Sequence, residues 1–386
     1  MKHLKIQKFT AHDSHRIMVM IDNLGMGGAQ KLLEVQISDM ALTHDFYVVN
    51  LGPETNFAQS LRAQGVTVVS YGGMRLTDLS ALLRLRRDMA AWAPDLIHSH
   101  LLYAALVGAV MARLLKVPHV TTLHNEKRVV LKLRDRMRNF LEEHVLRHMT
   151  SVVVACGPKI ARIQASHVGK TPLVTVANRV KPARQLPPER RAVLRQMVGS
   201  ADQDILVLAA GRLMPQKGFD ILLSAFARSV QKEPRARLLI VGEGPDQAVL
   251  DRQIKALGIE GRVRLHGPVS DLGEMLQIAD VFVLSSRYEG LPLVLIEALA
   301  AALPVVATRV GDVDTVLDEG CGLLVAPDDV GALAEGLDRV LANPDLRASM
   351  ARAAAVASRP HTDVQGFVAE LKAVYDTARQ RYDAPR

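Results

Sequence analysis

Residues 280–308 read DVFVLSSRYEGLPLVLIEALAAALPVVAT, and this stretch decides the fold. It joins an apolar, β-branched run, a short loop with glycine and proline, a segment rich in leucine and alanine, and a second β-branched run. A strand, a helix and another strand in this order form the unit of a parallel sheet covered by helices. Between Ser285 and Thr308, Glu289 and Glu297 are the two carboxylates in otherwise largely apolar or small company. The stretch predicts an α/β protein and asks what these two charges do.

The same alternation of strand and helix runs through both halves of the chain. It predicts a strand over 16–22, a helix over 29–42 and a strand over 45–52, and a second series that begins with a strand at 204–213. We interpret the proline-rich, charged stretch between 180 and 200 as the linker. Each half therefore predicts a doubly wound sheet of Rossmann type, whose ligands bind at the carboxyl ends of the strands.

These patterns divide the chain into three parts. Residues 1–185 form a first Rossmann-like domain, residues 186–360 form a second, and 361–386 form a C-terminal helix that packs back toward the first domain. We expect the two domains to face each other across an interdomain cleft that holds the functional site.

The composition bounds the class of protein. The chain has 386 residues, of which 49% are hydrophobic and two are cysteines, which favours a reducing compartment. No apolar run reaches the roughly 20 residues of a membrane-spanning helix and no signal peptide is apparent, so we expect a cytoplasmic protein. Residues 1–190 carry 26 Lys and Arg against 14 Asp and Glu, a net charge of +12 within a total of +8. This basic half points to an anionic partner, whether phosphorylated substrate, membrane surface or nucleic acid.

The turn LGMGGAQ follows the first predicted strand and opens the first predicted helix. Gly27 and Gly28 would let the backbone approach a ligand there, and the helix N-terminus would face an anion. The spacing does not fit the Gly-x-Gly-x-x-Gly dinucleotide fingerprint, and a plain tight turn is the alternative.

The equivalent turn of the second half, AGRLMPQKGFD, carries two cations. Arg212 and Lys217 lie in one strand-to-helix loop, where both could reach one pyrophosphate, Arg by a fork of donors and Lys as a point charge. Isolated, solvated surface cations are the alternative, but the position after a strand favours the functional interpretation.

Three motifs contain residue types that can hold metals or serve as catalytic groups. We expect His98 and His100 of HSH to point to opposite faces of their strand and therefore not to share a metal. We expect the DVD motif, with Asp312 and Asp314, to lie in a solvated loop, so we predict no metal site. His124 ends another strand and would face the cleft, with a hydrogen-bonded structural histidine as the alternative.

The segment 126–148, EKRVVLKLRDRMRNFLEEHVLRH, places apolar residues near helical spacing with Lys and Arg between them. This pattern is typical of a helix that lies in a membrane interface, and a packed helix with a basic outer face is the alternative. An anionic membrane surface is the partner we expect for this segment.

Together these motifs resemble the large retaining glycosyltransferase family 4, which has the GT-B fold. The resemblance is carried by GMGGAQ, PDLIHSH, TLHN, GRLMPQKG, VGEGP, GPV and above all SSRYEGLPLVLIEALAAALPVVAT, with its Glu-x7-Glu motif. It spans nearly the whole chain and implies two Rossmann-like domains, the first on the acceptor side with a membrane contact and the second on the nucleotide-sugar donor side. The chain departs from the family pattern at Arg179 and at Asp312, where the family has glycine.

The resemblance implies a role for each matching cation, glycine and histidine. Arg212 and Lys217 match the cations on the diphosphate of the donor. Gly27 and Gly28 match the loop that closes over the reacting centre, and His124 matches the histidine near the transferred sugar.

The two glutamates of the opening stretch receive different roles. Glu289 matches the glutamate that contacts the hydroxyls of the donor sugar, and Gly290 and Leu291 follow it with backbone N–H groups. Glu297 matches the glutamate on the ribose hydroxyls. A carboxylate accepts paired hydrogen bonds from neighbouring hydroxyls, so the assignment is chemically reasonable.

The activity implied is the metal-independent, retaining transfer of a hexose from a UDP- or GDP-sugar to a lipid-linked or polysaccharide acceptor. It would serve the biosynthesis of a cell-surface glycan, exopolysaccharide or lipopolysaccharide, without a cofactor, in a cytoplasmic protein peripheral to the inner face of the cell membrane. No nucleic acid is expected as a partner. A nucleotide-sugar epimerase of the same fold and a non-catalytic binder of nucleotide sugars or nucleic acid are the alternatives.

Overall fold

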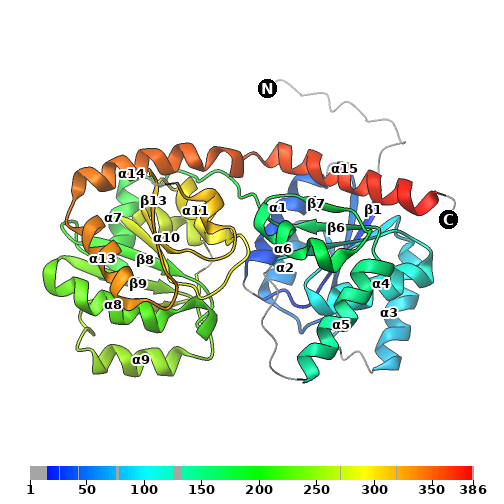
Figure 1. The fold of residues 1–386 in the computed structure, drawn as a ribbon, viewed down its shortest axis with the longest axis horizontal. Coiled ribbons are helices and arrows are strands. Elements are labelled where there is room, and N and C mark those ends of the chain that lie inside the picture. Colours follow the sequence, from blue (N-terminus) through cyan, green and yellow to red (C-terminus); the bar gives the residue numbers. More distant parts are fainter. Residues whose placement is uncertain are drawn as a thin grey trace. The chain divides into compact units, whose positions relative to one another are not determined.

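A computed structural model describes residues 15–384 except 26, 42, 75–77, 125–132, 270 and 319. The chain divides into two compact units, each a parallel sheet wound by helices (Figure 1). The described residues of the first unit fall within Met1–Ala155, Ala161–Val176 and Gln365–Arg386, and those of the second within Cys156–Ile160 and Ala177–Val364. The prediction of an α/β protein with two doubly wound domains is confirmed.

The sheet of the first unit has seven strands in the order β3-β2-β1-β4-β5-β6-β7, and all of its pairs are parallel. The order reverses between β1 and β4, where Ile21 pairs with His100. Strand ends at such a reversal are where doubly wound sheets bind ligands. The strands are β1 (Arg16–Ile21), β2 (Asp45–Asn50), β3 (Thr67–Ser70), β4 (Leu96–His100), β5 (His119–Leu123), β6 (Val152–Ala155) and β7 (Leu173–Thr175).

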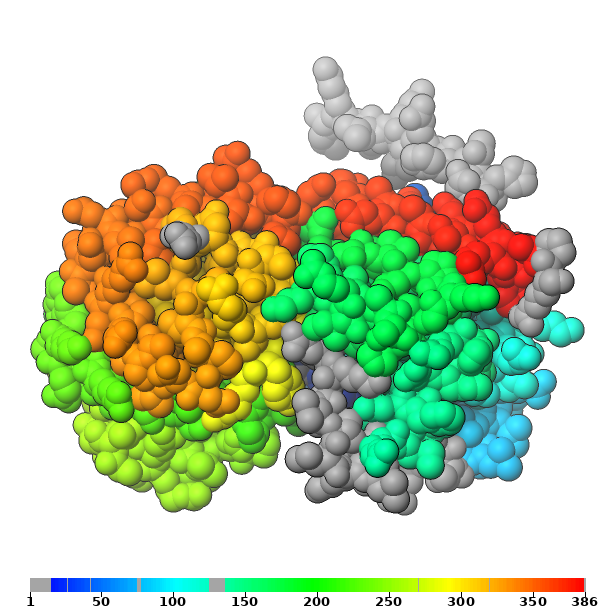
Figure 2. All heavy atoms as spheres, viewed as in Figure 1, coloured from blue at the N-terminus to red at the C-terminus, as the bar shows by residue number. Residues whose placement is uncertain are grey.

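The helices that accompany this sheet include the last helix of the chain. The helix α15 buries one stripe of side chains, from Phe367 to Ala378, and its outer side lies at the surface, drawn in red in Figure 2. None of the described helices is long and apolar enough to cross a membrane. The helices are α1 (Gly28–Met40), α2 (Asn56–Ala63), α3 (Leu79–Trp92), α4 (Leu102–Leu115), α5 (Leu133–His148), α6 (Pro158–Val168) and α15 (Val364–Asp383).

The sheet of the second unit has six parallel strands in the order β10-β9-β8-β11-β12-β13, so it repeats the reversal of the first sheet, here between β8 and β11. Its buried strands are continuous apolar runs, as expected for a sheet covered on both faces. The strands are β8 (Ile205–Ala210), β9 (Ala236–Val241), β10 (Val263–Gly267), β11 (Val281–Leu284), β12 (Val305–Thr308) and β13 (Gly322–Val325).

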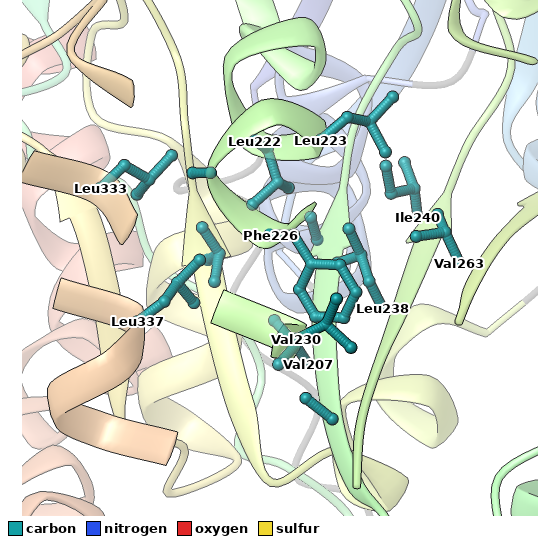
Figure 3. Close-up of a cluster of buried hydrophobic side chains, with 14 of the residues drawn as sticks. Val207, Leu222, Leu223, Phe226, Val230, Leu238, Ile240, Val263, Leu333 and Leu337 are labelled. Atoms are coloured by element: carbon teal, nitrogen blue, oxygen red, sulfur yellow. The ribbon is translucent and has the colours of Figure 1, made fainter. Parts of the chain in front are cut away.

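The main core of the second unit lies between this sheet and two of its helices. Figure 3 shows Phe226 and its neighbours on α8 packed against side chains of β8, β9 and β10 on one side and Leu333 and Leu337 of α13 on the other. The helices are α7 (Pro188–Met197), α8 (Phe219–Lys232), α9 (Gln247–Ala256), α10 (Leu272–Ile278), α11 (Leu293–Ala300), α12 (Val313–Val316), α13 (Val330–Leu341) and α14 (Pro344–Ala357), with the 3-10 turns η1 (Pro215–Lys217) and η2 (Arg359–His361).

The stretch 180–200, which we predicted as a linker, contains the helix α7, so this part of the prediction is wrong. Pro188 occupies the first position of the helix, where its fixed φ and missing N–H cost nothing. Arg195 is buried and donates to the carbonyl oxygens of Ile278 (2.8 Å) and Asp204 (2.7 Å). The proline content of the stretch 180–200 indicated a coil, but the tertiary hydrogen bonds of Arg195 hold residues 188–197 as a packed helix.

Candidate functional site

In the second unit, two loops follow strands that neighbour each other at the reversal of the sheet. Strand β8 pairs with β11, and both strands end at the same edge. The loop after β8 carries Arg212, which is exposed, and Lys217, which is partly buried. The loop after β11 carries Glu289, which is buried. The sheet order thus brings the predicted cations and the first glutamate to one place.

These two loops are joined by hydrogen bonds that do not depend on charge. The backbone N–H of Arg287 donates to the carbonyl oxygen of Gln216 (2.8 Å), and the Gln216 side chain donates in return to the carbonyl oxygen of Tyr288 (2.9 Å). The Ser285 hydroxyl donates to the carbonyl oxygen of Lys217 (2.8 Å). The backbone that carries Lys217 is therefore fixed relative to the backbone of the second loop.

The close approach of the loops requires a glycine at position 218. Gly218 has φ +61°, and a Cβ on it would collide with the carbonyl oxygen of Ser285. It ends the 3-10 turn η1 and starts α8, so the sharp change of direction that presents Lys217 depends on a residue without a side chain.

Lys217 and Glu289 form an ion pair at the centre of this arrangement. Lys217 Nζ lies 2.6 Å from Glu289 Oε1, and the Ser286 hydroxyl donates to the same oxygen at 2.6 Å. The side chains of Lys217 and Glu289 are only 17% and 7% exposed. A charge this far removed from water is costly without its partner, so each of the two groups stabilises the other in the site.

Arg287 holds the same two loops together from the outside. Its guanidinium binds both carboxylate oxygens of Asp220, at 2.9 and 2.8 Å, and its Nε lies 2.7 Å from Asp328 Oδ1. The hydrogen bonds to Asp220 raise the pKa of Arg287 above its usual value. Because a bidentate pair fixes direction as well as distance, Arg287 orients the start of α8 against the loop that carries Glu289.

The second glutamate lies on the helix that follows this loop. Pro292 is the N-cap of α11, and Glu297 is half-buried on that helix. Gly290 and Leu291, between the two glutamates, are both buried. The carbonyl oxygen of Leu291 accepts a hydrogen bond from the Asn178 side chain (2.7 Å), which further restrains the turn.

Asp312 is not in a solvated loop, so that expectation is wrong. It is completely buried, and its carboxylate accepts hydrogen bonds from the backbone N–H groups of Lys159 (2.7 Å) and Ile160 (3.1 Å) in the first turn of α6. Its own N–H donates to the carbonyl oxygen of Gly290 (2.8 Å). Asp312 therefore stabilises a helix N-terminus and links it to the loop that carries Glu289.

In the first unit, the predicted glycine loop lies at the end of β1. Gly27 is the N-cap of α1, and a Cβ on it would lie 2.6 Å from the Gln30 side-chain oxygen. The Gln30 side chain donates to the carbonyl oxygen of Asn23 (2.8 Å), which ties the loop together. Gly27 and Gly28 are exposed, so the backbone of this helix start is accessible.

Asp22, at the same strand end, points to a different helix. Its carboxylate accepts a hydrogen bond from the backbone N–H of Ala104 (2.6 Å) in the first turn of α4. Burial raises the pKa of Asp22 to about 6. The sequence patterns did not single out this residue, although an aspartate directly after a buried strand is a recognisable signal.

His98 and His100 lie on the same face of β4, so the expectation of opposite faces is wrong. Residues two apart on a strand point to the same side, and the two rings are 4.3 Å apart between centroids. His124 follows β5, and its Nε2 lies 3.0 Å from His100 Nδ1. Burial lowers the pKa of His98 to about 3 and that of His124 to about 4. The three histidines therefore form one neutral cluster at physiological pH.

The predicted residues thus fall into two sets, one in each unit. Within the described residues, no group of three or more His, Cys, Asp or Glu side chains is placed to hold a metal ion. The motifs identified Lys217, Glu289 and His124 by position. They did not identify Ser286, Arg287 and Asp220, and they gave Asp312 and His100 without the contacts that these residues make.

Comparison with known families covers most of the chain. Residues 191–356 match the model described as "Glycosyl transferases group 1", and residues 40–179 match "Glycosyl transferase 4-like domain". The chain is 31% identical over 295 residues to a D-inositol 3-phosphate glycosyltransferase of Saccharomonospora viridis. The alignment covers 71% of this chain and 68% of that protein. The chain belongs to the group 1 glycosyltransferases.

Another relative of this glycosyltransferase carries out a different reaction. The chain is 29% identical over 291 residues to an alpha-D-kanosaminyltransferase of Streptomyces kanamyceticus, and the alignment covers 70% of this chain and 73% of the relative. Among solved structures, Anabaena Alr3699/HepE in complex with UDP-glucose superposes with a TM-score of 0.84, at 21% identity, over 94% of this chain and 100% of that chain. The glycosyltransferase therefore has the two Rossmann-like domains of the GT-B fold.

Proposed function

We propose that this glycosyltransferase moves a hexose from a UDP- or GDP-sugar to a lipid-linked or polysaccharide acceptor of a cell-surface glycan, with retention at the anomeric carbon. The observation that carries the proposal is the ion pair between Lys217 and Glu289 at the reversal of the second sheet. It offers a cation for a diphosphate and a carboxylate for sugar hydroxyls side by side, which is the combination that a nucleotide sugar needs.

The leaving group determines what the cations do. When the bond between the anomeric carbon and the β-phosphate oxygen breaks, negative charge builds on that phosphate. In the proposed mechanism Lys217 and Arg212 neutralise this charge, and because their loop is already held by hydrogen bonds, little reorganisation is required. The leaving phosphate then accepts the proton of the acceptor hydroxyl as the new bond forms on the same face, so no metal and no separate base is needed.

The two glutamates bind the two ends of the donor in this proposal. Glu289 accepts hydrogen bonds from hydroxyls of the transferred sugar, with the N–H groups of Gly290 and Leu291 beside it. Glu297, eight residues later on α11, accepts those of the ribose. Gly27 and Gly28 supply accessible backbone near the reacting centre, and His124 contacts the transferred sugar.

An anionic membrane surface is the partner we propose for the first unit. Met137, Phe140 and Leu141 are exposed on α5. Residues 126–132 of the predicted segment 126–148 lie outside the described residues. Helix α4 packs against α5 and exposes Val110 and, one turn later, Leu114. Exposed apolar side chains beside arginines are the composition that binds an interface of anionic lipids. A cytoplasmic protein on the inner face of the cell membrane would meet a lipid-linked acceptor there.

A thermal-shift comparison tests the donor site. The true donor should raise the melting temperature by mass action, and a nucleoside diphosphate alone should do so to a smaller extent. Glu289→Gln should lose the increment that the sugar adds and keep that of the diphosphate, whereas Glu297→Gln should weaken both. Transfer to an acceptor distinguishes the proposed reaction from epimerisation, which releases an altered sugar nucleotide without acceptor. If no UDP- or GDP-sugar stabilises the protein, the proposal is wrong.

A further inference from the structure

A chain of buried hydrogen bonds links the C-terminal helix to the histidine cluster. The side-chain nitrogen of Gln36 on α1 lies 2.6 Å from the hydroxyl of Tyr375 on α15, and this hydroxyl lies 2.9 Å from Nδ1 of His98. On its other side, Nε2 of His98 lies 2.8 Å from the hydroxyl of Thr122 on β5. All four side chains are almost completely buried, so solvent does not compete for these bonds.

The chemistry of the groups determines the direction of each bond. An amide nitrogen can only donate, so Gln36 donates to the Tyr375 oxygen. The single hydroxyl hydrogen of Tyr375 is then the one that points to Nδ1 of His98, which must accept it. A neutral imidazole that accepts at Nδ1 carries its proton on Nε2 and donates it to Thr122. Tyr375 therefore selects the tautomer and the ring orientation of His98.

The oriented ring of His98 borders the pair that contains the proposed catalytic histidine. The rings of His98 and His100 are 4.3 Å apart with an angle of 37° between their planes. His100 Nδ1 lies 3.0 Å from His124 Nε2, while His100 Nε2 is buried and has no hydrogen-bond partner among the described residues. A buried N–H group without an acceptor is rarer in proteins than a buried nitrogen lone pair without a donor. We therefore place the lone pair of His100 on Nε2 and its proton on Nδ1. His100 then donates to His124, whose own proton lies on Nδ1.

Little water can replace a lost member of this network. A cavity of about 10 Å³, room for about one water molecule, adjoins His98, His100 and Thr122. Phe367 and Leu371, from the same helix as Tyr375, form part of its wall. Removal of the Tyr375 hydroxyl would thus take the nearer donor from Nδ1 of His98 and leave it only the Gln36 amide nitrogen, 3.5 Å away, so that its ring would be held less firmly.

We propose that Tyr375 is a positioning residue for His124: by holding the ring of His98, which packs on the ring of His100, the C-terminal helix fixes the orientation of the hydrogen-bonded pair of His100 and His124. The importance of His124 for transfer rests on the proposed function. Burial keeps the pKa values of these histidines far below neutral, so the network acts by orientation and tautomer and not by charge.

The variant Tyr375→Phe tests this, because it removes only the hydroxyl and keeps the buried ring. We expect kcat to fall on the order of tenfold, the equivalent of one buried hydrogen bond, with the donor KM changed by less than about twofold. In protein labelled with ¹⁵N-histidine, the imidazole resonances of His98, His100 and His124 should shift, because their rings lose their fixed orientation. Thr122→Val, which acts on the opposite end of the network without touching α15, should shift the same resonances.

Tyr382→Phe is the matched control, since Tyr382 lies seven residues further along α15 and is partly exposed. It should leave both kcat and the resonances unchanged. Unaltered resonances in Tyr375→Phe, or unaltered kcat despite shifted resonances, would overturn the positioning role. Lack of transfer by the unaltered protein would count against the proposed function instead, and the resonances would still decide whether Tyr375 sets the tautomer of His98.

Discussion

Lys217 Nζ and Glu289 Oε1 are 2.6 Å apart, although the two residues belong to different loops of the second unit. The backbone of both loops is fixed by the hydrogen bonds around Gln216. In the proposed function, a donor would meet a preorganised cation and carboxylate. Its diphosphate and its sugar would then compete for the contacts that these two side chains make with each other.

Replacement of either partner should nearly abolish transfer. In Lys217→Ala or Glu289→Ala we expect kcat to fall by about 10² to 10³, the range for loss of one preorganised charge-stabilising group. Lys232→Ala is the control, because Lys232 forms an ion pair with Asp338 on the surface of the same unit. Normal turnover of either site variant in an assay of purified enzyme would contradict the site assignment.

Arg287→Lys should weaken donor binding without removing a charge. Lysine cannot reproduce the bidentate bond to Asp220, so the loops at Lys217 and Glu289 should become less well oriented. We expect the donor KM to rise about tenfold, the equivalent of one charge-assisted hydrogen bond. Arg235→Lys, at an exposed pair with Glu233, should have no effect on steady-state kinetics. Equal KM values for the two variants would exclude a role of Arg287 in donor binding.

Asp312→Ala should destabilise the protein, because the backbone N–H groups of Lys159 and Ile160 lose their acceptor. The free energy of unfolding should fall by about 1 to 2 kcal/mol, the usual cost of removing a helix cap. Asp314→Ala, which removes contacts of 3.6 Å with the Lys159 side chain and 3.9 Å with the exposed Arg309 side chain, should cost much less. Urea unfolding of both variants measures the difference, and similar midpoints would show that Asp312 does not act as a cap.

Mild acid should destabilise the first unit. Unfolded histidines titrate near pH 6.5, whereas burial holds the pKa of His98 and of His119 at about 3 in the fold. Between these values the unfolded chain binds more protons, so stability falls with decreasing pH by about 1.4 kcal/mol per pH unit for each such histidine. Asp22, whose pKa is raised to about 6, has the opposite effect on stability. Between about pH 4 and 6 the folded state binds the extra proton, so Asp22 adds stability as the pH falls.

Fluorescence of Trp92, the single tryptophan, reports on this unit because Trp92 packs on its core and against Tyr47. Urea titrations at pH 7 and pH 5 should show a lower free energy of unfolding at pH 5. In His119→Asn the free energy of unfolding should change less steeply with pH, by the slope that corresponds to about one proton. A free energy that does not change between these pH values would show that the buried histidines are not held neutral.

Phe140→Glu should weaken binding to anionic vesicles. Phe140 is 67% exposed on α5, and its replacement removes apolar area and adds a charge that anionic lipid repels. Val249→Glu makes a similar change on α9 of the second unit, at a side chain that is 51% exposed, and should not alter binding. Sedimentation with vesicles that contain anionic lipid, at low salt, measures both. Equal binding of the two variants would move the membrane contact away from α5.

Much of the architecture follows from local patterns. The runs from 204 to 213 and from 280 to 286 form β8 and β11, because β-branched and apolar side chains favour buried strands. The segment rich in leucine and alanine that follows β11 forms α11, with Pro292 as its N-cap. The helix α7 was missed because its stability comes from bonds that Arg195 makes to residues more than eighty positions away as well as nearby.

The functional motifs show the same limit. Their strand-end positions indicated Arg212, Lys217, Glu289 and His124, since parallel sheets expose ligands at the carboxyl ends of strands. The burial of Asp312 was not apparent, because its acceptor role depends on a helix that begins 154 positions earlier, at Pro158. The common face of His98 and His100, in contrast, follows from strand periodicity alone and was available from the sequence.

By itself the sequence determined most of the strands and helices, though not α7, as well as which loops carry cations, glycines and carboxylates and to which family the motifs are similar. These properties depend on residues within one or two turns of each other. Only the tertiary structure decided that Lys217 pairs with Glu289 and that Tyr375 contacts His98, which lies 277 positions away. Such contacts depend on strand order and close packing, which arise from the whole chain and leave no local periodicity in it.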